Sequence, residues 1–280
     1  MAKLALCIGI NNYPGTHMDL AGCVNDAKDW SAELVSRGFA VKQLVDAAAT
    51  KAAMVAGFRD VIGRADKADL VVITFSGHGT FVPDNNGDEV DGFDEGLCPY
   101  DLQTGGQALL DDEIQQLFAA RKPGVRLVLI SDSCHSGTVT RAAVDPEAAD
   151  DVPRQRFMPM GNWLPPERLP RGASGKPVAQ VPVNSGASPF ASAMSKGLSD
   201  LLISGCKEGP NNFSYDARIK GRACGAFTYY ALKTLKGLPA GATYADWVAA
   251  MTPKFLPSVT YPQTPQIVGS PDARRLKIFE

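Results

Sequence analysis

The strongest strand signals in the sequence are DLVVITFS at residues 69–76 and VRLVLIS at residues 125–131. Each is a short apolar run that is rich in β-branched residues and bounded by polar or glycine-containing turns, which is typical of a buried strand. The first run continues into His78, which has a glycine on either side, and the second reaches Cys134 shortly after it ends. A histidine and a cysteine at the ends of two strong strands are therefore the first candidates for chemistry.

Strand and helix patterns alternate through the rest of the chain. Further strands are predicted at 3–10, 39–45 and 200–206 with an edge strand near 276–279, and helices at 19–37, after the capping residue Thr50, and at about 112–120, 226–235 and 244–251. This alternation predicts an α/β fold, with a mostly parallel β-sheet flanked by helices on both faces. Sites in such sheets form beyond the carboxyl ends of the strands, so His78 and Cys134 should share one rim.

Composition excludes several classes of protein. The 280 residues are 45% hydrophobic and 21% charged with a formal net charge of −2, which predicts a globular domain with no polyanionic partner, hence no nucleic acid. No apolar run approaches the ~20 residues of a membrane helix, and the first residues lack a signal-peptide pattern, so we expect a cytoplasmic protein without a membrane partner. The six cysteines form no C-x-x-C pair, which argues against a zinc or disulfide framework.

The organisation of the chain follows from one break in the pattern. Residues 141–189 contain 9 of the 20 prolines and little periodicity, which indicates an exposed linker or long loop. The stretches on either side, 1–140 and 190–280, are expected to form one composite catalytic domain. The second stretch contains one confident strand, which is too little to build a sheet of its own.

The Cys–His pair suggests nucleophilic catalysis. A thiol with a pKa of about 8.5 and an imidazole with one of about 6.5 are well matched to exchange a proton when they lie close together. The backbone amides of Gly79 and Cys134 are candidates for an oxyanion hole.

Alternatives exist for each part of this site. For a lone cysteine or histidine, a small buried side chain and a tight turn are the better explanations, but two motifs that close neighbouring strands favour chemistry. His135 competes for the role of base, although adjacent residues on an extended chain point apart. A serine hydrolase built on Ser133 lacks the G-x-S-x-G elbow.

The two motifs, SGHG at 76–79 and DSCHSG at 132–137, resemble those of caspase-like cysteine peptidases of the metacaspase and bacterial orthocaspase family. The separation of Cys134 and His78, 134 − 78 = 56 residues, is close to the ~50 of the caspase signature. The resemblance implies a caspase-like fold with a large-subunit-like (p20) region at 1–140 and a small-subunit-like (p10) region at 190–280. It also implies a cysteine endopeptidase in which Cys134 is the nucleophile and His78 the general base.

The same resemblance implies a first specificity pocket formed by Cys23, Asp26, Ser76 and Asp132. Two carboxylates in a partly desolvated pocket favour a cationic side chain, so we expect cleavage of peptides or proteins after Arg or Lys. An Asp-specific caspase-like peptidase and a catalytically silent interaction module on the same fold are the competing functions. Ordinary loop-orienting or solvated roles explain the two aspartates about equally well in the absence of the family match.

Calcium ligands are also implied by the resemblance, at Asp94 (with Glu95 as an alternative), Asp111 and Asp112. The fourth acidic position is occupied by Arg141, a cation that would repel Ca²⁺. We therefore expect that no cofactor is required. An acidic surface loop and an ordinary helix N-terminus explain the same acidic residues equally well.

The linker places basic residues next to a pocket expected to accept them. We therefore predict self-cleavage (autoprocessing) after one of four arginines, with the two fragments staying associated; an insertion that is never cut is the alternative. The candidates are Arg154, Arg156, Arg168 and Arg171. The family resemblance further implies a monomer.

Overall fold

A six-stranded sheet forms the centre of the computed structural model, which describes residues 1–84, 93–105, 107–134, 152–171, 200–207, 212–251 and 261–280. Its strand order is β12-β9-β7-β3-β1-β2. Five strands are parallel and β12 pairs antiparallel with β9. The strands are β1 (Lys3–Gly9), β2 (Ala40–Val45), β3 (Leu70–Ser76), β7 (Arg126–Asp132), β9 (Asp200–Ser204) and β12 (Gln266–Val268).

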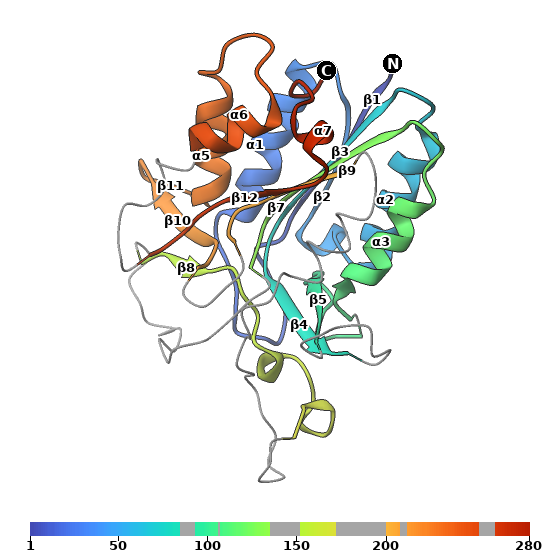
Figure 1. The fold of residues 1–280 in the computed structure, drawn as a ribbon. Coiled ribbons are helices and arrows are strands. Elements are labelled where there is room, and N and C mark those ends of the chain that lie inside the picture. Colours follow the sequence, from blue (N-terminus) through green and yellow to red (C-terminus); the bar gives the residue numbers. More distant parts are fainter. Residues whose placement is uncertain (85–92, 106, 135–151, 172–199, 208–211, 252–260) are drawn as a thin grey trace.

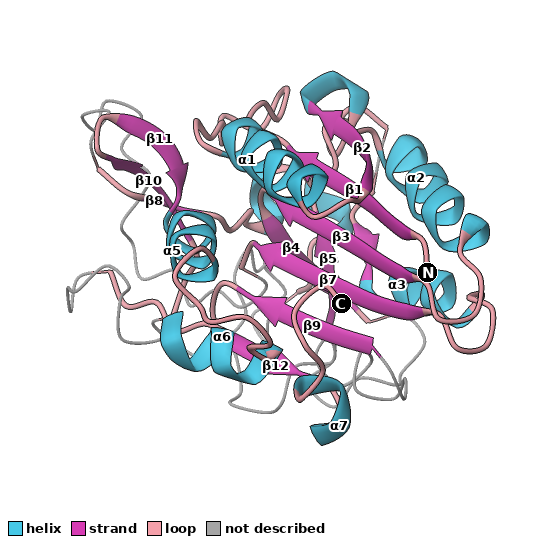
Figure 2. Cartoon of the chain, turned by 90° about the horizontal axis from the view of Figure 1, so that it is seen from above, coloured by secondary structure: helices cyan, strands magenta, loops and turns pink. Residues whose placement is uncertain are grey.

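Helices cover both faces of this sheet, as Figures 1 and 2 show. On one face α2 (Lys51–Arg64) and α3 (Asp111–Ala119) bury Phe58 and Phe118 in one apolar cluster. On the other face lie α1 (Cys23–Ser36), α5 (Ala226–Leu235) and α6 (Tyr244–Met251), and α7 (Pro271–Arg274) adds to their cluster. The two faces are buried because crossover helices between parallel strands must pack on them.

Two small sheets lie beyond the carboxyl ends of the central strands. One has the order β4-β5-β6, from β4 (Gly79–Pro83), β5 (Phe93–Leu97) and β6 (Leu109–Leu110). The other has the order β11-β10-β8, from β8 (Arg154–Gln155), β10 (Tyr215–Ile219) and β11 (Arg222–Gly225). The two small sheets lie next to the rim where β3 and β7 end (Figure 1).

Most of the predicted strands and helices are confirmed. Thr50 caps α2 by accepting a hydrogen bond from the Ala53 N–H, as its position predicted. The edge strand expected near 276–279 is wrong: β12 takes that edge, and Phe279 has a φ of 59° and packs its ring against Trp247. A positive φ interrupts an extended strand, and the buried ring holds the terminus against the helices instead.

The linker prediction also needs a correction. Within 141–189, the described residues 152–171 include β8 and two 3-10 turns, Met160–Asn162 and Pro166–Arg168. Their chain is not simply exposed, because Arg156, Phe157, Met158, Met160, Trp163 and Leu164 are all buried. Proline content gave a correct indication of irregular structure, but it carries no information about whether an irregular segment packs on the core.

In the part of the chain that the structure describes, no helix is long and apolar enough to cross a membrane.

Candidate active site

The two candidate catalytic residues follow neighbouring parallel strands. In the register of β3 and β7, Ser76 pairs with Asp132, and His78 and Cys134 each come two residues later. Both strands are buried along almost their whole length, so their ends are held rigidly at one rim. The predicted juxtaposition of the two strand ends is therefore present in the structure.

His78 is buried and held from two sides. The Tyr13 hydroxyl accepts the His78 backbone N–H at 2.8 Å, and the imidazole Nε2 lies 2.6 Å from the carbonyl oxygen of Met18. A carbonyl can only accept, so Nε2 donates this bond and Nδ1 is the atom that can take up a proton. Burial lowers the pKa of His78 to about 4, although interactions with the Met18 backbone, Asp216 and the Arg156 backbone raise it in part. The imidazole is therefore neutral at neutral pH.

Cys134 is fully buried as a free thiol. Its sulfur accepts a hydrogen bond from the backbone N–H of Ser214 and lies 3.3 Å from the sulfur of Cys206. Ser214 precedes β10 and Cys206 follows β9, so the surroundings of the sulfur come from the C-terminal third of the chain.

A buried arginine fills the pocket beside Cys134. The Arg156 Nη2 atom lies 2.7 Å from Asp26 and 2.8 Å from Asp216, and its Nη1 atom lies 3.1 Å from Asp132. The Arg156 side chain is 0% exposed. Three carboxylates from α1, β7 and β10 thus converge on one guanidinium, the kind of charge-assisted contact for which arginine is suited.

The electrostatics of this pocket follow from its burial. Burial raises the pKa of Asp26 to about 7, and attraction to Arg156 opposes that rise. For Arg156, burial lowers the pKa, but the charges of Asp132, Asp26 and Asp216 together shift it well above its usual value. The cation and the carboxylates therefore depend on one another for their charged states.

The backbone around Arg156 is bound as firmly as its side chain. The Arg156 carbonyl oxygen accepts hydrogen bonds from the backbone N–H of Gly79 at 3.0 Å and of Cys134 at 3.1 Å. The Arg156 N–H donates to the Ser214 carbonyl at 2.9 Å, and β8 pairs antiparallel with β10. The two amides predicted as an oxyanion hole thus converge on one carbonyl oxygen, that of the residue in the acidic pocket.

The two remaining predicted pocket residues, Cys23 and Ser76, are both buried. Cys23 is buried, and burial raises the pKa of its thiol while Arg156 lowers it, so Cys23 lines the pocket as a neutral group. Ser76 is buried at the end of β3, opposite Asp132 in the register.

Asp216 is the pocket residue that sequence reasoning missed. It accepts hydrogen bonds from the backbone N–H groups of Ala21 and Gly22 as well as contacting Arg156. Its signal in the sequence was a charged residue within the apolar stretch FSYDA at 213–217, which is unusual for a buried strand.

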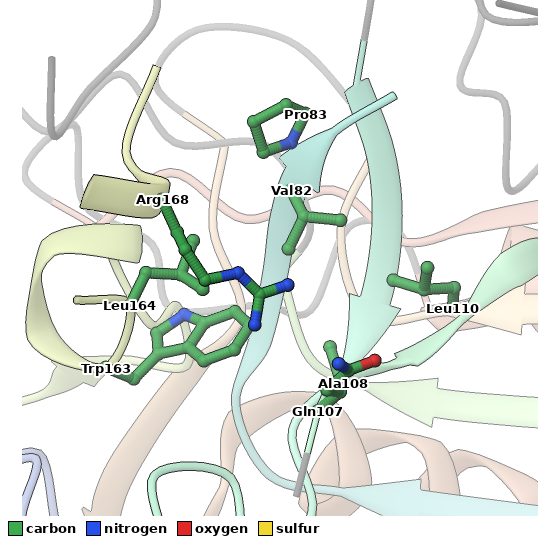
Figure 3. A pocket seen from close by; sticks show the side chains of 8 residues that line it. All are labelled: Val82, Pro83, Gln107, Ala108, Leu110, Trp163, Leu164 and Arg168. Carbon is green, nitrogen blue, oxygen red and sulfur yellow. The ribbon is translucent and has the colours of Figure 1, made fainter. Parts of the chain in front are cut away.

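The four candidate arginines of the linker have different surroundings. Arg154 is half-buried and donates to the Asp19 carbonyl at 3.1 Å, whereas Arg171 is exposed. Arg168 is exposed at the rim of a cavity of about 300 Å³ beyond the end of β4. Figure 3 shows Trp163, Leu164 and Arg168 on one side of this cavity and Leu110 on the other. This cavity contains none of the predicted catalytic or pocket residues.

The predicted calcium ligands come from β5 and the start of α3. Asp94 lies in β5, and Asp111 and Asp112 are the first residues of α3. Among the described residues, no three histidine, cysteine or acidic side chains are grouped closely enough to hold a metal ion. Arg141 and His135 lie outside the described residues.

A mostly parallel sheet between two helical layers, with a cysteine and a histidine at neighbouring strand ends, defines a protein of the caspase-like fold class. Residues 3–143 match the family model described as the metacaspase, peptidase C14 domain. The chain belongs to the metacaspase family.

Individual relatives agree with this assignment. Metacaspase-1 of Cryptococcus neoformans is 32% identical over 85% of this chain and 56% of its own length. Metacaspase-1 of Meyerozyma guilliermondii is 30% identical over 96% of this chain and 69% of its own. Metacaspase-4 of Arabidopsis thaliana is 39% identical over 49% of this chain and 34% of its own. This chain therefore spans between about a third and about two thirds of the length of these relatives.

A solved structure covers nearly the whole chain. The crystal structure of protein GSU0716 from Geobacter sulfurreducens superposes with a TM-score of 0.70 at 31% sequence identity. The match covers 99% of this chain and 97% of that one. The fold of this chain is therefore found in an experimental structure over almost its full length.

Proposed function

We propose that this chain is a cysteine endopeptidase that cleaves peptide bonds after Arg or Lys, with Cys134 as nucleophile and His78 as general base. The observation that carries the proposal is the position of Arg156. Its guanidinium lies among three buried carboxylates while its carbonyl oxygen accepts hydrogen bonds from the Gly79 and Cys134 amides. A cationic side chain among carboxylates, with its carbonyl oxygen on two convergent N–H donors, is bound as the residue before a cleaved bond would be.

The chemistry uses groups that the chain already contains. Neutral His78 accepts the thiol proton on Nδ1, and the Cys134 thiolate attacks the carbonyl carbon of the bound residue. The electron pair of the C=O bond moves to the oxygen, which the two N–H groups stabilise. Return of the pair breaks the C–N bond, and the amine leaves with the proton from His78. Water then hydrolyses the thioester and restores the thiol. A monomer suffices, because every residue named belongs to one chain.

The same contacts support self-processing. The bond that would be attacked joins Arg156 and Phe157, which gives fragments 1–156 and 157–280. While the chain is uncut, Arg156 occupies the pocket that another substrate needs, so the intact protein should be inhibited toward other peptides. A tethered ligand has a high effective concentration and competes strongly with free peptides.

Masses of the purified protein test this proposal. Wild type should yield the two fragments on incubation, and Cys134→Ala should stay intact. Arg156→Lys should still be cut at the same bond, Arg156→Gln should not, and Arg154→Gln serves as the matched control that is cut normally. Identical fragments from wild type and Cys134→Ala would contradict the proposal. Cleavage after Arg168 or Arg171, with the bond between Arg156 and Phe157 intact, would also contradict it.

The Asp-specific alternative is disfavoured by the charge of the pocket. An anionic side chain beside Asp26, Asp132 and Asp216 would leave four carboxylates buried together without a cation. Paired fluorogenic peptides with Arg and Asp before the bond decide between the two. Faster hydrolysis of the Asp peptide would support the Asp-specific peptidase. If neither peptide is hydrolysed and an arginyl electrophile does not label Cys134, the catalytically silent interaction module is favoured.

A further inference from the structure

The segment that follows Arg156 is bound as specifically as the segment before it. Phe157 forms a parallel bridge with Gly79, the first residue of β4. The Met158 N–H donates to the Gly79 carbonyl at 2.8 Å, and the Thr80 hydroxyl donates to the Met158 carbonyl at 2.8 Å. The chain after the predicted scissile bond is thus added to β4 as a short strand.

An aromatic side chain on β4 receives Phe157. Residues at i and i+2 of a strand lie on the same face, so Phe81 projects on the same side as the position of Gly79. Gly79 has no side chain opposite Phe157, and the ring of Phe157 stacks on Phe81 with centroids 5.5 Å apart and an interplanar angle of 25°. Both rings are buried.

A second ring fixes the orientation of Phe81. Phe93, from β5, meets Phe81 edge-on, with centroids 5.3 Å apart and an interplanar angle of 76°. A stacked partner on one side and an edge-on partner on the other match the geometries that aromatic pairs prefer. The receiving surface is therefore shaped by two strands of the small sheet, independently of the carboxylate pocket.

We propose that Phe81 and Phe93 form a subsite for the residue after the cleaved bond, and that this subsite selects an aromatic side chain there. The inference rests on the proposed function, because it assumes cleavage after a basic residue. The preferred substrates are then peptides in which Arg or Lys is followed by Phe, Tyr or Trp. Specificity comes from both sides of the bond, from charge on one side and from ring stacking on the other.

Internally quenched peptides that differ at one position test the subsite. Each peptide has Arg before the bond and Phe, Leu or Ala after it, and the self-processed wild-type enzyme is assayed with each. We expect kcat/KM for Phe to exceed that for Leu by between about twofold and about tenfold, the range that a stacked aromatic pair supplies beyond area burial, and to exceed that for Ala by more. If all three peptides are cleaved after Arg at equal rates, or if the Phe and Leu peptides are cleaved equally fast, the aromatic subsite is refuted. The proposed function is unaffected by either result. No cleavage after Arg in any peptide refutes the proposed function itself.

A variant pair separates the subsite from general packing. Phe81→Leu keeps an apolar side chain but removes the ring, so the Phe-to-Leu ratio of kcat/KM should fall toward one. Phe39→Leu is the matched control, since Phe39 is also buried but contacts Phe279 in the apolar cluster on the other face of the central sheet. The ratio is measured within one enzyme preparation, so a loss of folded protein does not change it. An unchanged ratio in Phe81→Leu, or an equal fall in Phe39→Leu, overturns the assignment.

Discussion

The backbone N–H of Cys134 donates a hydrogen bond to the carbonyl oxygen of Arg156 at 3.1 Å. A residue of the predicted linker therefore lies at the candidate nucleophile, although 22 positions separate the two in the sequence. The side chain of the same arginine forms ion pairs with three buried carboxylates. The bond after Arg156 and the stability of the uncut chain are thus linked through one residue.

Removing the cation should destabilise the intact protein. In the Cys134→Ala background, Arg156→Gln leaves Asp26, Asp132 and Asp216 buried without a counter-charge. We expect the free energy of unfolding to fall by about 3–5 kcal/mol, the usual effect of breaking a buried ion pair. Urea denaturation followed by circular dichroism measures this.

A small guanidinium compound provides the control for that effect. Agmatine should raise the melting temperature of the Arg156→Gln protein, because it can occupy the vacated pocket and binds only the folded state. It should have little effect on the parent, whose pocket is filled. Arg154→Gln, at a half-buried site, should change stability by less than ~1 kcal/mol. A similar loss in both variants would contradict the assigned role of the pocket.

Asp216 should contribute to discrimination for a basic residue. Asp216→Asn keeps an oxygen that can accept from the Ala21 and Gly22 N–H groups but removes a charge next to the guanidinium. We expect kcat/KM for an Arg peptide to fall about 10- to 100-fold relative to a matched citrulline peptide, because a charge-assisted hydrogen bond is worth about 1.5–3 kcal/mol. Equal losses on both peptides would indicate a purely structural role. Asp29→Asn, at an exposed pair with Arg222, is the control.

Gly225 should tolerate no side chain. A Cβ atom there would collide with the Asp132 carboxylate and lie 2.6 Å from the Arg156 guanidinium. Gly225→Ala should therefore reduce self-cleavage and raise KM for Arg peptides at least severalfold, because the methyl group takes space needed by the guanidinium. The control is Gly63→Ala in α2, whose Cβ would meet nothing within 4 Å. Unimpaired binding of Arg peptides by Gly225→Ala would argue against the pocket.

The buried histidine should make stability depend on pH. Burial lowers the pKa of His78 from 6.5 to about 4, so the unfolded chain binds more protons between these values. The contribution of this group to the free energy of unfolding therefore rises from pH 4 to pH 6.5 and is lost as pH falls through that range. Its full size, about 1.36 kcal/mol for each unit between 6.5 and about 4, is on the order of 3 kcal/mol.

Comparison with a variant isolates this contribution. The pKa of Asp26 is raised to about 7, so its contribution runs in the opposite direction, declining as pH rises from about 4 to 7. The difference in unfolding free energy between the Cys134→Ala protein and its His78→Gln derivative removes the Asp26 component. From pH 4 to 6.5 the unfolding free energy of the Cys134→Ala protein should rise relative to that of its His78→Gln derivative. A difference that stays constant or falls would contradict a buried neutral imidazole.

Self-cleavage should not require calcium. Arg141 stands where the family resemblance implies an acidic ligand, and a cation at that point opposes Ca²⁺ binding. Protein treated with a chelator should therefore form fragments 1–156 and 157–280 at a rate that added CaCl₂ changes less than about twofold. A strong acceleration by Ca²⁺ that Asp111→Asn abolishes would show the expectation to be wrong.

Local patterns in the sequence were sufficient for the central sheet and for the candidate dyad. A β-branched run between turns predicts a strand from neighbouring residues alone, and parallel strands then bring His78 and Cys134 to one rim. The terminal edge strand was mispredicted because Phe279 packs against residues far away in the sequence, among them Phe39. Its local apolar pattern did not distinguish a strand from a buried turn.

By itself, the sequence determined the strands, the placement of Cys134 and His78 after two of them, and the acidic residues Asp26 and Asp132 as pocket candidates. Only the tertiary structure decided which linker arginine enters that pocket, that Asp216 completes it, and that Phe81 receives the next residue. The reason is physical: Arg156 meets Asp26 across 130 residues and Asp216 across 60. Contacts of that range depend on how the small sheets close over the rim, and a proline-rich segment has no local periodicity that records its partners.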